Sequence, residues 1–298
     1  MKLAAVFPPM ATPFDNDEVD VAAIRGNIEK WTAGGVGGVV ALGSNGEAPL
    51  LDDDESDRVV DAARDALGRG LLLIAGTGRE STRATIAASR RAAAGGADAV
   101  LVRTPSYFKP RMTPDAFLRH YTAVADACPV PVLLYNYPAV TGVNITPETV
   151  GRLSQHPNIA GIKETGTDTA QFAAFVDAAR PPFAVMAGSA PVFYPWLCLG
   201  ATGGILAVAC VVPEMCVRLL EHAAAGRHDA ARALQREITP LARLVTTGYG
   251  VPGLKAAMDL AGYTGGDPRP PLGPAPPAAI EQIRTELDRV RKACEQYA

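Results

Sequence analysis

The chain has 298 residues, of which 48% are hydrophobic and 20% charged, a composition typical of a globular protein with one large domain or a domain and an appendage. Its formal net charge is −3, which gives no reason to expect nucleic acid or an anionic membrane as a partner. No apolar run approaches the roughly 20 residues that a membrane span requires, and the N-terminus reaches Pro8 too early for a signal peptide, so we expect a cytoplasmic protein.

Apolar runs alternate with helical stretches from the N-terminus to residue 225. The runs predict eight strands, at 5–9, 37–42, 71–75, 99–103, 130–135, 159–163, 183–187 and 204–207. Helical periodicity predicts helices at 19–33, 52–67, 81–94, 113–127, 147–153, 169–179 and 190–199. Continuously apolar strands that alternate with helices indicate a parallel sheet covered on both faces, and eight such units match a closed (β/α)8 barrel. The segment 8–13 (PPMATP) lacks the glycine-rich pattern that an open doubly wound sheet would carry there.

After residue 225 the strands stop. The pattern predicts helices at 230–247, 252–260 and 278–297, with a Gly/Pro-rich connection at 262–277 that cannot continue either neighbouring helix. A flexible tail is the alternative, but the long amphipathic terminal pattern favours a small helical appendage. We therefore expect a (β/α)8 catalytic barrel at 1–225 and a C-terminal helical domain at 226–298.

The cysteines and histidines show no pattern of metal ligands or of a serine triad. No CxxC pair, HExxH or zinc spacing occurs. We expect the five scattered cysteines to be small buried hydrophobic residues in a reducing compartment, and we expect no metal site; the cysteines are Cys128, Cys198, Cys210, Cys216 and Cys294.

Polar residues follow the strands at the end where barrel enzymes carry their active sites. The second strand ends in 43–47 (GSNGE), where glycines allow close backbone approach and Ser44 and Asn45 add donors, an arrangement that suits a carboxylate. A polar turn without a ligand is the alternative. The fourth and fifth strands lead to Tyr107 and Tyr135, which are either packing residues at the barrel mouth or parts of the same site.

A lysine lies inside the apolar sixth strand. Lysine occurs at only six positions, whereas arginine is abundant. Because arginine cannot lose its proton and lysine can, a lysine at position 163 suggests a chemical role. Strand alternation places Lys163 on the face of Gly161 and opposite Glu164. A lysine in a dry barrel has a lowered pKa and becomes a nucleophile near neutral pH. The alternative is an ion pair with Glu164 or another acid at the rim, and the spacing leaves both readings open.

Four motifs in order resemble the pyruvate-dependent class I aldolase family, which includes dihydrodipicolinate synthase, N-acetylneuraminate lyase and 4-hydroxy-2-oxoglutarate aldolase. The motifs are at 43–47 (GSNGE), 104–107 (TPSY), 135–138 (YNYP) and 161–165 (GIKET), and the resemblance runs nearly end to end. It implies a (β/α)8 TIM barrel with a C-terminal helical domain, a small-molecule 2-keto acid substrate, no cofactor, and a homotetramer built as a dimer of dimers.

The resemblance also implies roles for individual residues. Lys163 resembles the Schiff-base lysine, and Tyr135 resembles the tyrosine that moves protons to and from the bound carbonyl. Ser44 and Asn45 stand where the family holds the pyruvate carboxylate and relays a proton.

Two further positions match the family pattern. Tyr107 resembles a relay tyrosine that in some members reaches into the neighbouring subunit's site. Ile205 matches a residue of the last strand whose backbone carbonyl faces the site.

The branch of the family is indicated by two departures from dihydrodipicolinate synthase. Val140 stands where that enzyme carries an arginine for the aldehyde's carboxylate, and Asn45 stands where it usually carries a threonine. Segments 154–159, 249–255 and 262–266 look like the 4-hydroxy-2-oxoglutarate aldolase branch. We therefore expect a lyase that cleaves a 4-hydroxy-2-keto acid, either 4-hydroxy-2-oxoglutarate or a 2-keto-3-deoxy sugar acid, to pyruvate and an aldehyde. The alternatives are a dihydrodipicolinate synthase, a related keto-acid dehydratase, or a barrel that only binds a ligand.

Overall fold

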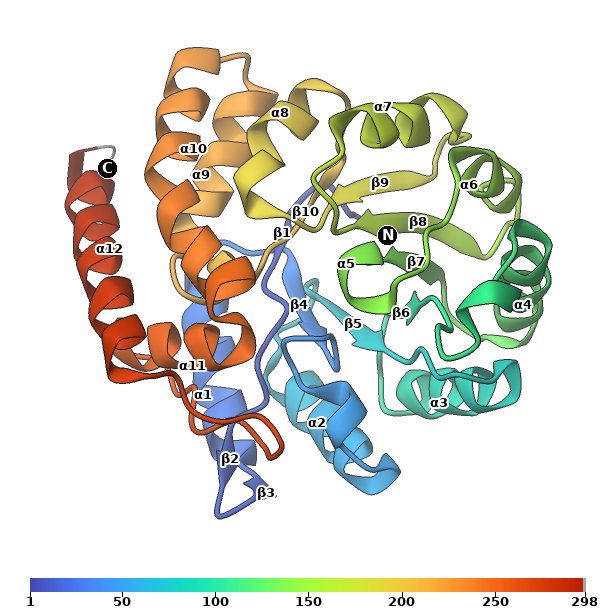
Figure 1. The fold of residues 1–298 in the computed structure, drawn as a ribbon, viewed down its shortest axis with the longest axis horizontal. Coiled ribbons are helices and arrows are strands. Elements are labelled where there is room, and N and C mark those ends of the chain that lie inside the picture. Colours follow the sequence, from blue (N-terminus) through green and yellow to red (C-terminus); the bar gives the residue numbers. More distant parts are fainter. Residues whose placement is uncertain (297–298) are drawn as a thin grey trace.

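The computed structural model describes residues 1–296, and its centre is a barrel of eight parallel strands (Figure 1). The strand order is β1-β10-β9-β8-β7-β6-β5-β4. A parallel bridge between Pro9 and Val40 joins β1 to β4 and closes the barrel. All eight predicted strands are confirmed to within a few residues: β1 (Val6–Phe7), β4 (Gly38–Ala41), β5 (Leu72–Gly76), β6 (Ala99–Arg103), β7 (Val132–Asn136), β8 (Ile159–Glu164), β9 (Ala184–Ala187) and β10 (Gly203–Ile205).

Helices follow the strands and surround the barrel, as predicted (Figure 1). The acid-rich turn at the start of α2 forms a capping box, in which Asp52 accepts from the amide of Glu55 while the carboxylate of Glu55 accepts from the amide of Asp52. The helices of this layer are α1 (Val21–Ala33), α2 (Asp53–Ala66), α3 (Thr82–Ala94), α4 (Pro114–Ala127), α6 (Pro147–Leu153), α7 (Thr169–Ala178), α8 (Phe193–Cys198) and α9 (Pro213–Ala224).

Several elements were not predicted from the sequence. Helix α9 begins with Pro213, which looks like a breaker but is tolerated at a first helical position because the N–H there has no intrahelical partner. The short helix α5 (Pro138–Thr141) and the hairpin β2 (Phe14–Asp15) and β3 (Glu18–Val19) were also missed. Helix α5 and the two strands of the hairpin have only a few residues each, too few for a periodic pattern.

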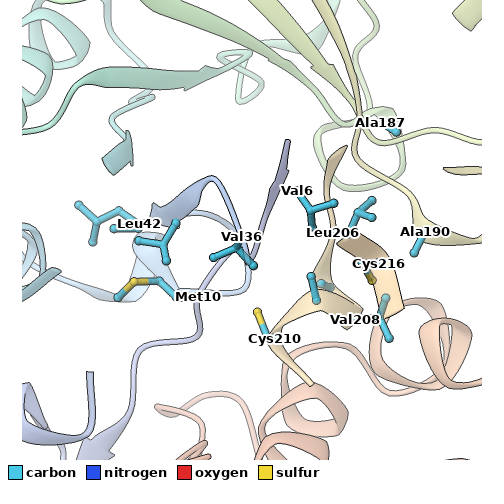
Figure 2. Packing of buried hydrophobic residues seen from close by; sticks show 14 of the residues in the cluster. Val6, Met10, Val36, Leu42, Ala187, Ala190, Leu206, Val208, Cys210 and Cys216 are labelled. Carbon is cyan, nitrogen blue, oxygen red and sulfur yellow. The ribbon is translucent and has the colours of Figure 1, made fainter. Parts of the chain in front are cut away.

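Alternate strand residues build two separate cores. In β7, Leu133 and Tyr135 belong to a cluster that contains no helical residue and fills the barrel, whereas Val132 and Leu134 pack with the surrounding helices. Figure 2 shows part of this outer core around Met10. The period of two therefore decides which side chains can reach the mouth of the barrel from the inside.

The helical segment after residue 225 consists of α10 (His228–Arg243), a π-helical turn (Leu244–Gly248), α11 (Gly250–Ala261) and α12 (Pro277–Gln296). Helix α12 lies beside α10 and α11 at the edge of the molecule, and the α11–α12 connection runs back toward the β2–β3 hairpin and α2 (Figure 1). The predicted helices are confirmed, although Tyr297 lies outside the described residues. The division into two domains at 225/226 stays a prediction.

The cysteines differ in part from the expectation. Cys128, Cys210 and Cys216 are buried, but Cys198 is exposed, so the expectation of burial is wrong there. In the short helix α8, Trp196 faces inward and Cys198, two residues later, faces outward. The side chain of Cys294 lies outside the described residues. None of the helices in the described part of the chain combines the length and the apolar character that a bilayer crossing demands.

Candidate active site

Lys163 lies near the C-terminal end of β8, inside the barrel. It is paired in register with Tyr135 of β7, and its amine lies 4.3 Å from the centroid of the Tyr135 ring. Its residue exposure is 4%. Gly161, two residues earlier, lies close to the neighbouring strand β9, where a Cβ would lie 2.5 Å from the carbonyl oxygen of Ala184. The prediction from strand alternation, that Lys163 and Glu164 lie on opposite faces of the strand, is confirmed, and the structure shows that the face of Lys163 is the inner one.

Glu164 faces the opposite way and does not pair with the lysine. Its carboxylate accepts hydrogen bonds from the side chain of Asn136 at 2.7 Å and from the amide of Gly166 at 2.6 Å. Within the described residues, no carboxylate lies within ion-pair distance of the Lys163 amine. A rim ion pair with Glu164, the alternative that the sequence left open, is therefore wrong.

Burial lowers the pKa of Lys163 from 10.5 to about 7, because the charged ammonium loses its hydration inside the barrel. With that pKa, roughly half of the molecules carry a neutral amine near neutral pH. A neutral amine has a free lone pair and can add to a carbonyl carbon, which a rim lysine with an ordinary pKa does far less often.

Tyr135 places its phenol beside the turn that follows β4. Its hydroxyl lies 3.3 Å from the hydroxyl of Ser44, and the ring stacks on Tyr137 with the centroids 5.8 Å apart. Burial raises the pKa of Tyr135, and the hydrogen bond with Ser44 opposes that change. The phenol is therefore protonated at neutral pH and is joined to a second hydroxyl, a pair that can pass a proton.

The turn that carries Ser44 and Asn45 has a fixed backbone. The amide of Gly46 donates to the carbonyl of Gly43 at 3.1 Å, and the amide of Glu47 donates to the carbonyl of Ser44 at 3.2 Å. The hydroxyl of Thr12, which follows β1, donates to the carbonyl of Gly46 at 2.8 Å. The side-chain amide of Asn45 has no hydrogen-bond partner within residues 1–296, so its donors are free for a ligand.

Two residues of this region were not singled out from the sequence. The hydroxyl of Thr165, two positions after Lys163, interacts with the Tyr135 phenol and, like Ser44, opposes the rise in its pKa. Gly188 follows β9, and a Cβ there would lie 2.2 Å from the Thr165 hydroxyl oxygen and 3.0 Å from Cε of Lys163. Thr165 was present in the quoted GIKET motif, but the need for a glycine at position 188 depends on a contact between strands that spacing does not reveal.

The remaining predicted site residues are placed differently. Ile205 is fully buried in the interior cluster with Tyr135. Tyr107 is 79% exposed and forms no hydrogen bond with Ser44 or Tyr135 in this single chain. Val140, on α5, is 64% exposed. The structure therefore brings together Lys163, Tyr135, Ser44, Asn45 and Ile205 in one barrel mouth, and it leaves Tyr107 facing solvent.

Comparisons with known proteins agree with this fold. Residues 2–290 match the sequence profile of the Dihydrodipicolinate synthetase family. The chain is 35% identical to a 4-hydroxy-tetrahydrodipicolinate synthase of Methanospirillum hungatei, over 95% of this chain and 98% of that protein. It is 37% identical to a probable mitochondrial 4-hydroxy-2-oxoglutarate aldolase of Emericella nidulans, over 97% of this chain and 96% of that protein.

A solved structure extends the likeness to three dimensions. The crystal structure of YagE, a prophage protein of the dihydrodipicolinic acid synthase family from E. coli K12 in complex with pyruvate, superposes with a TM-score of 0.92. The two chains are 29% identical, and the match covers 98% of this chain and 99% of that one.

Proposed function

Because the chain belongs to the Dihydrodipicolinate synthetase family, we propose that it is a Schiff-base aldolase that cleaves a 4-hydroxy-2-keto acid to pyruvate and an aldehyde. The family consists of pyruvate-dependent lyases and synthases that act on small keto acids, and this chain is an enzyme of that lyase class. The observation that carries the proposal is the Lys163 amine, which is buried without a carboxylate partner and lies over the ring of Tyr135.

The first half of the proposed reaction forms an imine. The neutral amine of Lys163 adds to the C2 carbonyl carbon of the keto acid, and water leaves to give an iminium ion. Ser44 and Asn45 hold the carboxylate through donors at the turn after β4, beside the hydroxyl of Tyr135. The positive iminium then withdraws electrons from the neighbouring carbon–carbon bonds, so the enzyme needs no cofactor for this step.

The second half breaks the C3–C4 bond. Tyr135 gives its proton to the oxygen that leaves as water in the first half, and the resulting phenolate, hydrogen-bonded to Ser44, accepts the proton of the C4 hydroxyl. The electron pair of the C3–C4 bond then moves to the iminium, and the aldehyde departs from an enamine. Protonation of the enamine at C3 and addition of water release pyruvate and restore the free amine. General acid–base assistance of this kind contributes typically ~10²–10⁴-fold to a rate.

Tyr107 enters the proposal through a second copy of the chain. Its exposed ring lies against the exposed Phe108 with the centroids 5.1 Å apart, and an apolar pair of this kind at the barrel mouth suits a contact between subunits. We place Tyr107 in the site of a neighbouring subunit, where it extends the relay from Tyr135 and Ser44. The proposed enzyme is thus a homo-oligomer, a tetramer built as a dimer of dimers, and acts in the cytoplasm.

Val140 bears on the choice of aldehyde. A valine side chain cannot form the charge-assisted hydrogen bonds by which an arginine holds a carboxylate, each worth roughly 1.5–3 kcal/mol. This argues against aspartate semialdehyde as the second substrate. Of the two proposed substrates it favours a 2-keto-3-deoxy sugar acid, because the aldehyde released from 4-hydroxy-2-oxoglutarate also carries a carboxylate. Two similar proteins carry the names of the two competing activities, a synthase and an aldolase, at nearly equal identity.

A panel of substrates tests the proposal. Pyruvate release is measured from 4-hydroxy-2-oxoglutarate and from 2-keto-3-deoxy sugar acids, and a coupled synthase assay uses pyruvate with aspartate semialdehyde. We expect the wild-type chain to cleave at least one member of the panel. Lys163→Ala is expected to lose this activity. Lys292→Ala, which replaces an exposed lysine of α12, is expected to keep it.

Two results would contradict the proposal. Turnover only in the synthase assay would refute the argument from Val140 and leave the Schiff base in place. No reaction with any 2-keto acid would favour a barrel that binds a ligand without chemistry.

A further inference from the structure

A buried ion pair joins the turn after β4 to the C-terminal helical segment. Nζ of Lys255, on α11, lies 2.6 Å from Oε1 of Glu47, and the two side chains are 1% and 0% exposed. The same ammonium donates to the carbonyl of Asp267 at 2.8 Å. Glu47 is the last residue of the GSNGE turn, and its neighbours include Ser44 and Asn45.

Arg269, in the α11–α12 connection, makes the second contact with this turn. Its backbone amide donates to Oε2 of Glu47 at 2.8 Å. Its guanidinium forms a two-pronged pair with Glu55 of α2, with N···O distances of 2.8 and 2.7 Å, and also contacts Asp17 of the hairpin. The connection is thereby fixed to the elements on both sides of the turn.

One aromatic ring contacts both cations. The Phe14 ring of β2 has the Lys255 ammonium 4.5 Å and the Arg269 guanidinium 4.3 Å from its centroid. The connection also packs tightly on α11, because a Cβ at Gly265 would lie 2.2 Å from the carbonyl oxygen of Lys255. Both cations are thus held by packing as well as by charge.

The backbone of Glu47 shows why the turn needs this support. Glu47 has a φ of +56° and Leu42 a φ of +54°, so the segment from 43 to 46 is bounded by two non-glycine residues in the left-handed region. Such a backbone conformation is strained and persists only when its surroundings hold it. The amide of Glu47 donates to the carbonyl of Ser44, so a shift of Glu47 moves Ser44 directly.

We propose that Glu47, Lys255 and Arg269 form a clamp through which the C-terminal segment positions Ser44 and Asn45 for the substrate carboxylate. These three are positioning residues, because they contact one another and none of them hydrogen-bonds to Lys163 or Tyr135 within the described chain. The inference rests on the proposed function only in taking the turn as the carboxylate site. The competing explanation is an ion pair that stabilises the fold and has no effect on substrate selection.

Substitution of Glu47 separates these explanations. In Glu47→Ala both contacts of the carboxylate are lost, whereas Glu47→Gln keeps an acceptor for the Arg269 amide. A matched control is Glu237→Gln, which breaks the ion pair of α10 with Arg289 of α12 and leaves the turn untouched. Two readouts are compared in the full-length chain: hydrogen exchange of the peptide that spans 42–51, and reductive trapping on Lys163 with pyruvate and with acetone, a carbonyl that has no carboxylate.

The clamp predicts a change in selectivity. Relative to the wild type, the pyruvate-to-acetone trapping ratio falls about tenfold in Glu47→Ala, as expected for one lost charge-assisted contact, and less in Glu47→Gln. Exchange in 42–51 becomes faster in the same order, and Glu237→Gln matches the wild type in both readouts. If Glu47→Ala does not fold, Glu47→Gln decides.

Other outcomes overturn the clamp or the chemistry separately. A parallel loss of trapping for both carbonyls, or unchanged exchange in 42–51, overturns the clamp and leaves the aldolase proposal standing. No adduct on Lys163 of the wild type overturns the aldolase proposal, and the exchange measurement alone then decides the clamp.

Discussion

Lys163→Met removes a buried amine that the barrel holds at a thermodynamic cost. The pKa of Lys163 falls from 10.5 in the unfolded chain to about 7 in the barrel, so near pH 7 folding releases a proton from about half of the molecules. Each pKa unit corresponds to 1.36 kcal/mol, which makes the cost about 4 kcal/mol near pH 7. The methionine side chain is also long and unbranched, but it has no ionisable group. After subtraction of ~1 kcal/mol for the lost attraction to the Tyr135 ring, we expect a stabilisation of about 3 kcal/mol.

The sign of the pH dependence follows from the direction of the shift. Because the pKa is lower in the folded state, the unfolded chain binds more protons between about pH 7 and pH 10.5, and the stability of the wild type rises with pH over that window. The cost is fully present below the folded pKa and fades toward the unfolded value. Near pH 9.5 only about one pKa unit of the cost remains, about 1.4 kcal/mol, so after the same subtraction the advantage of Lys163→Met shrinks to roughly 0.4 kcal/mol.

Urea denaturation of both chains at several pH values measures this difference. Lys163→Arg is the matched control, because a buried guanidinium cannot release its proton and is expected to destabilise the fold at every pH. A Lys163→Met chain that is less stable than the wild type near neutral pH would refute the argument, and so would a gain that does not change with pH. Both Lys163→Met and Lys163→Arg are expected to lose activity. In Lys163→Met, stability therefore rises while activity is lost.

Three further predictions concern the reaction itself. Tyr135→Phe should lower kcat by ~10²–10⁴-fold while imine trapping with pyruvate continues, and an unchanged kcat would remove Tyr135 from the proton path. Gly188→Ala should lower trapping on Lys163, because the new Cβ overlaps the Thr165 hydroxyl and the backbone of Glu164; wild-type trapping would show that the strand ends can separate without effect. The rate of imine formation should rise through about pH 7 and level off above about pH 8, whereas a tenfold rise per unit up to about pH 9.5 would indicate an ordinary lysine pKa.

The sequence predicted the barrel well because its signals are local. An apolar run followed by a helical stretch is visible within a window of about 20 residues, and strand alternation alone placed Lys163 and Glu164 on opposite faces of their strand. Glu164, next in the chain, shows the limit: spacing puts it on the other face, but only its contact with Asn136 excludes the rim ion pair.

Features that depend on distant contacts could not be predicted in the same way. The pairing of Glu47 with Lys255 joins a barrel turn to a helix near the C-terminus, and neither residue has a local pattern that names its partner. Tyr107 is a different case, because its exposed position in one chain leaves its predicted role dependent on a second subunit. The sequence therefore indicated the residues of the candidate site more completely than the contacts that hold them in place.

The most direct test of the account is the covalent bond between Lys163 and pyruvate. The chain is treated with pyruvate and borohydride, and the mass of the intact protein and of its peptides is measured. We predict a single stable adduct, with the mass of a reduced pyruvate imine, on the peptide that contains Lys163, and no adduct in Lys163→Ala. An unmodified wild-type chain, or an adduct on another lysine, would contradict the central claim.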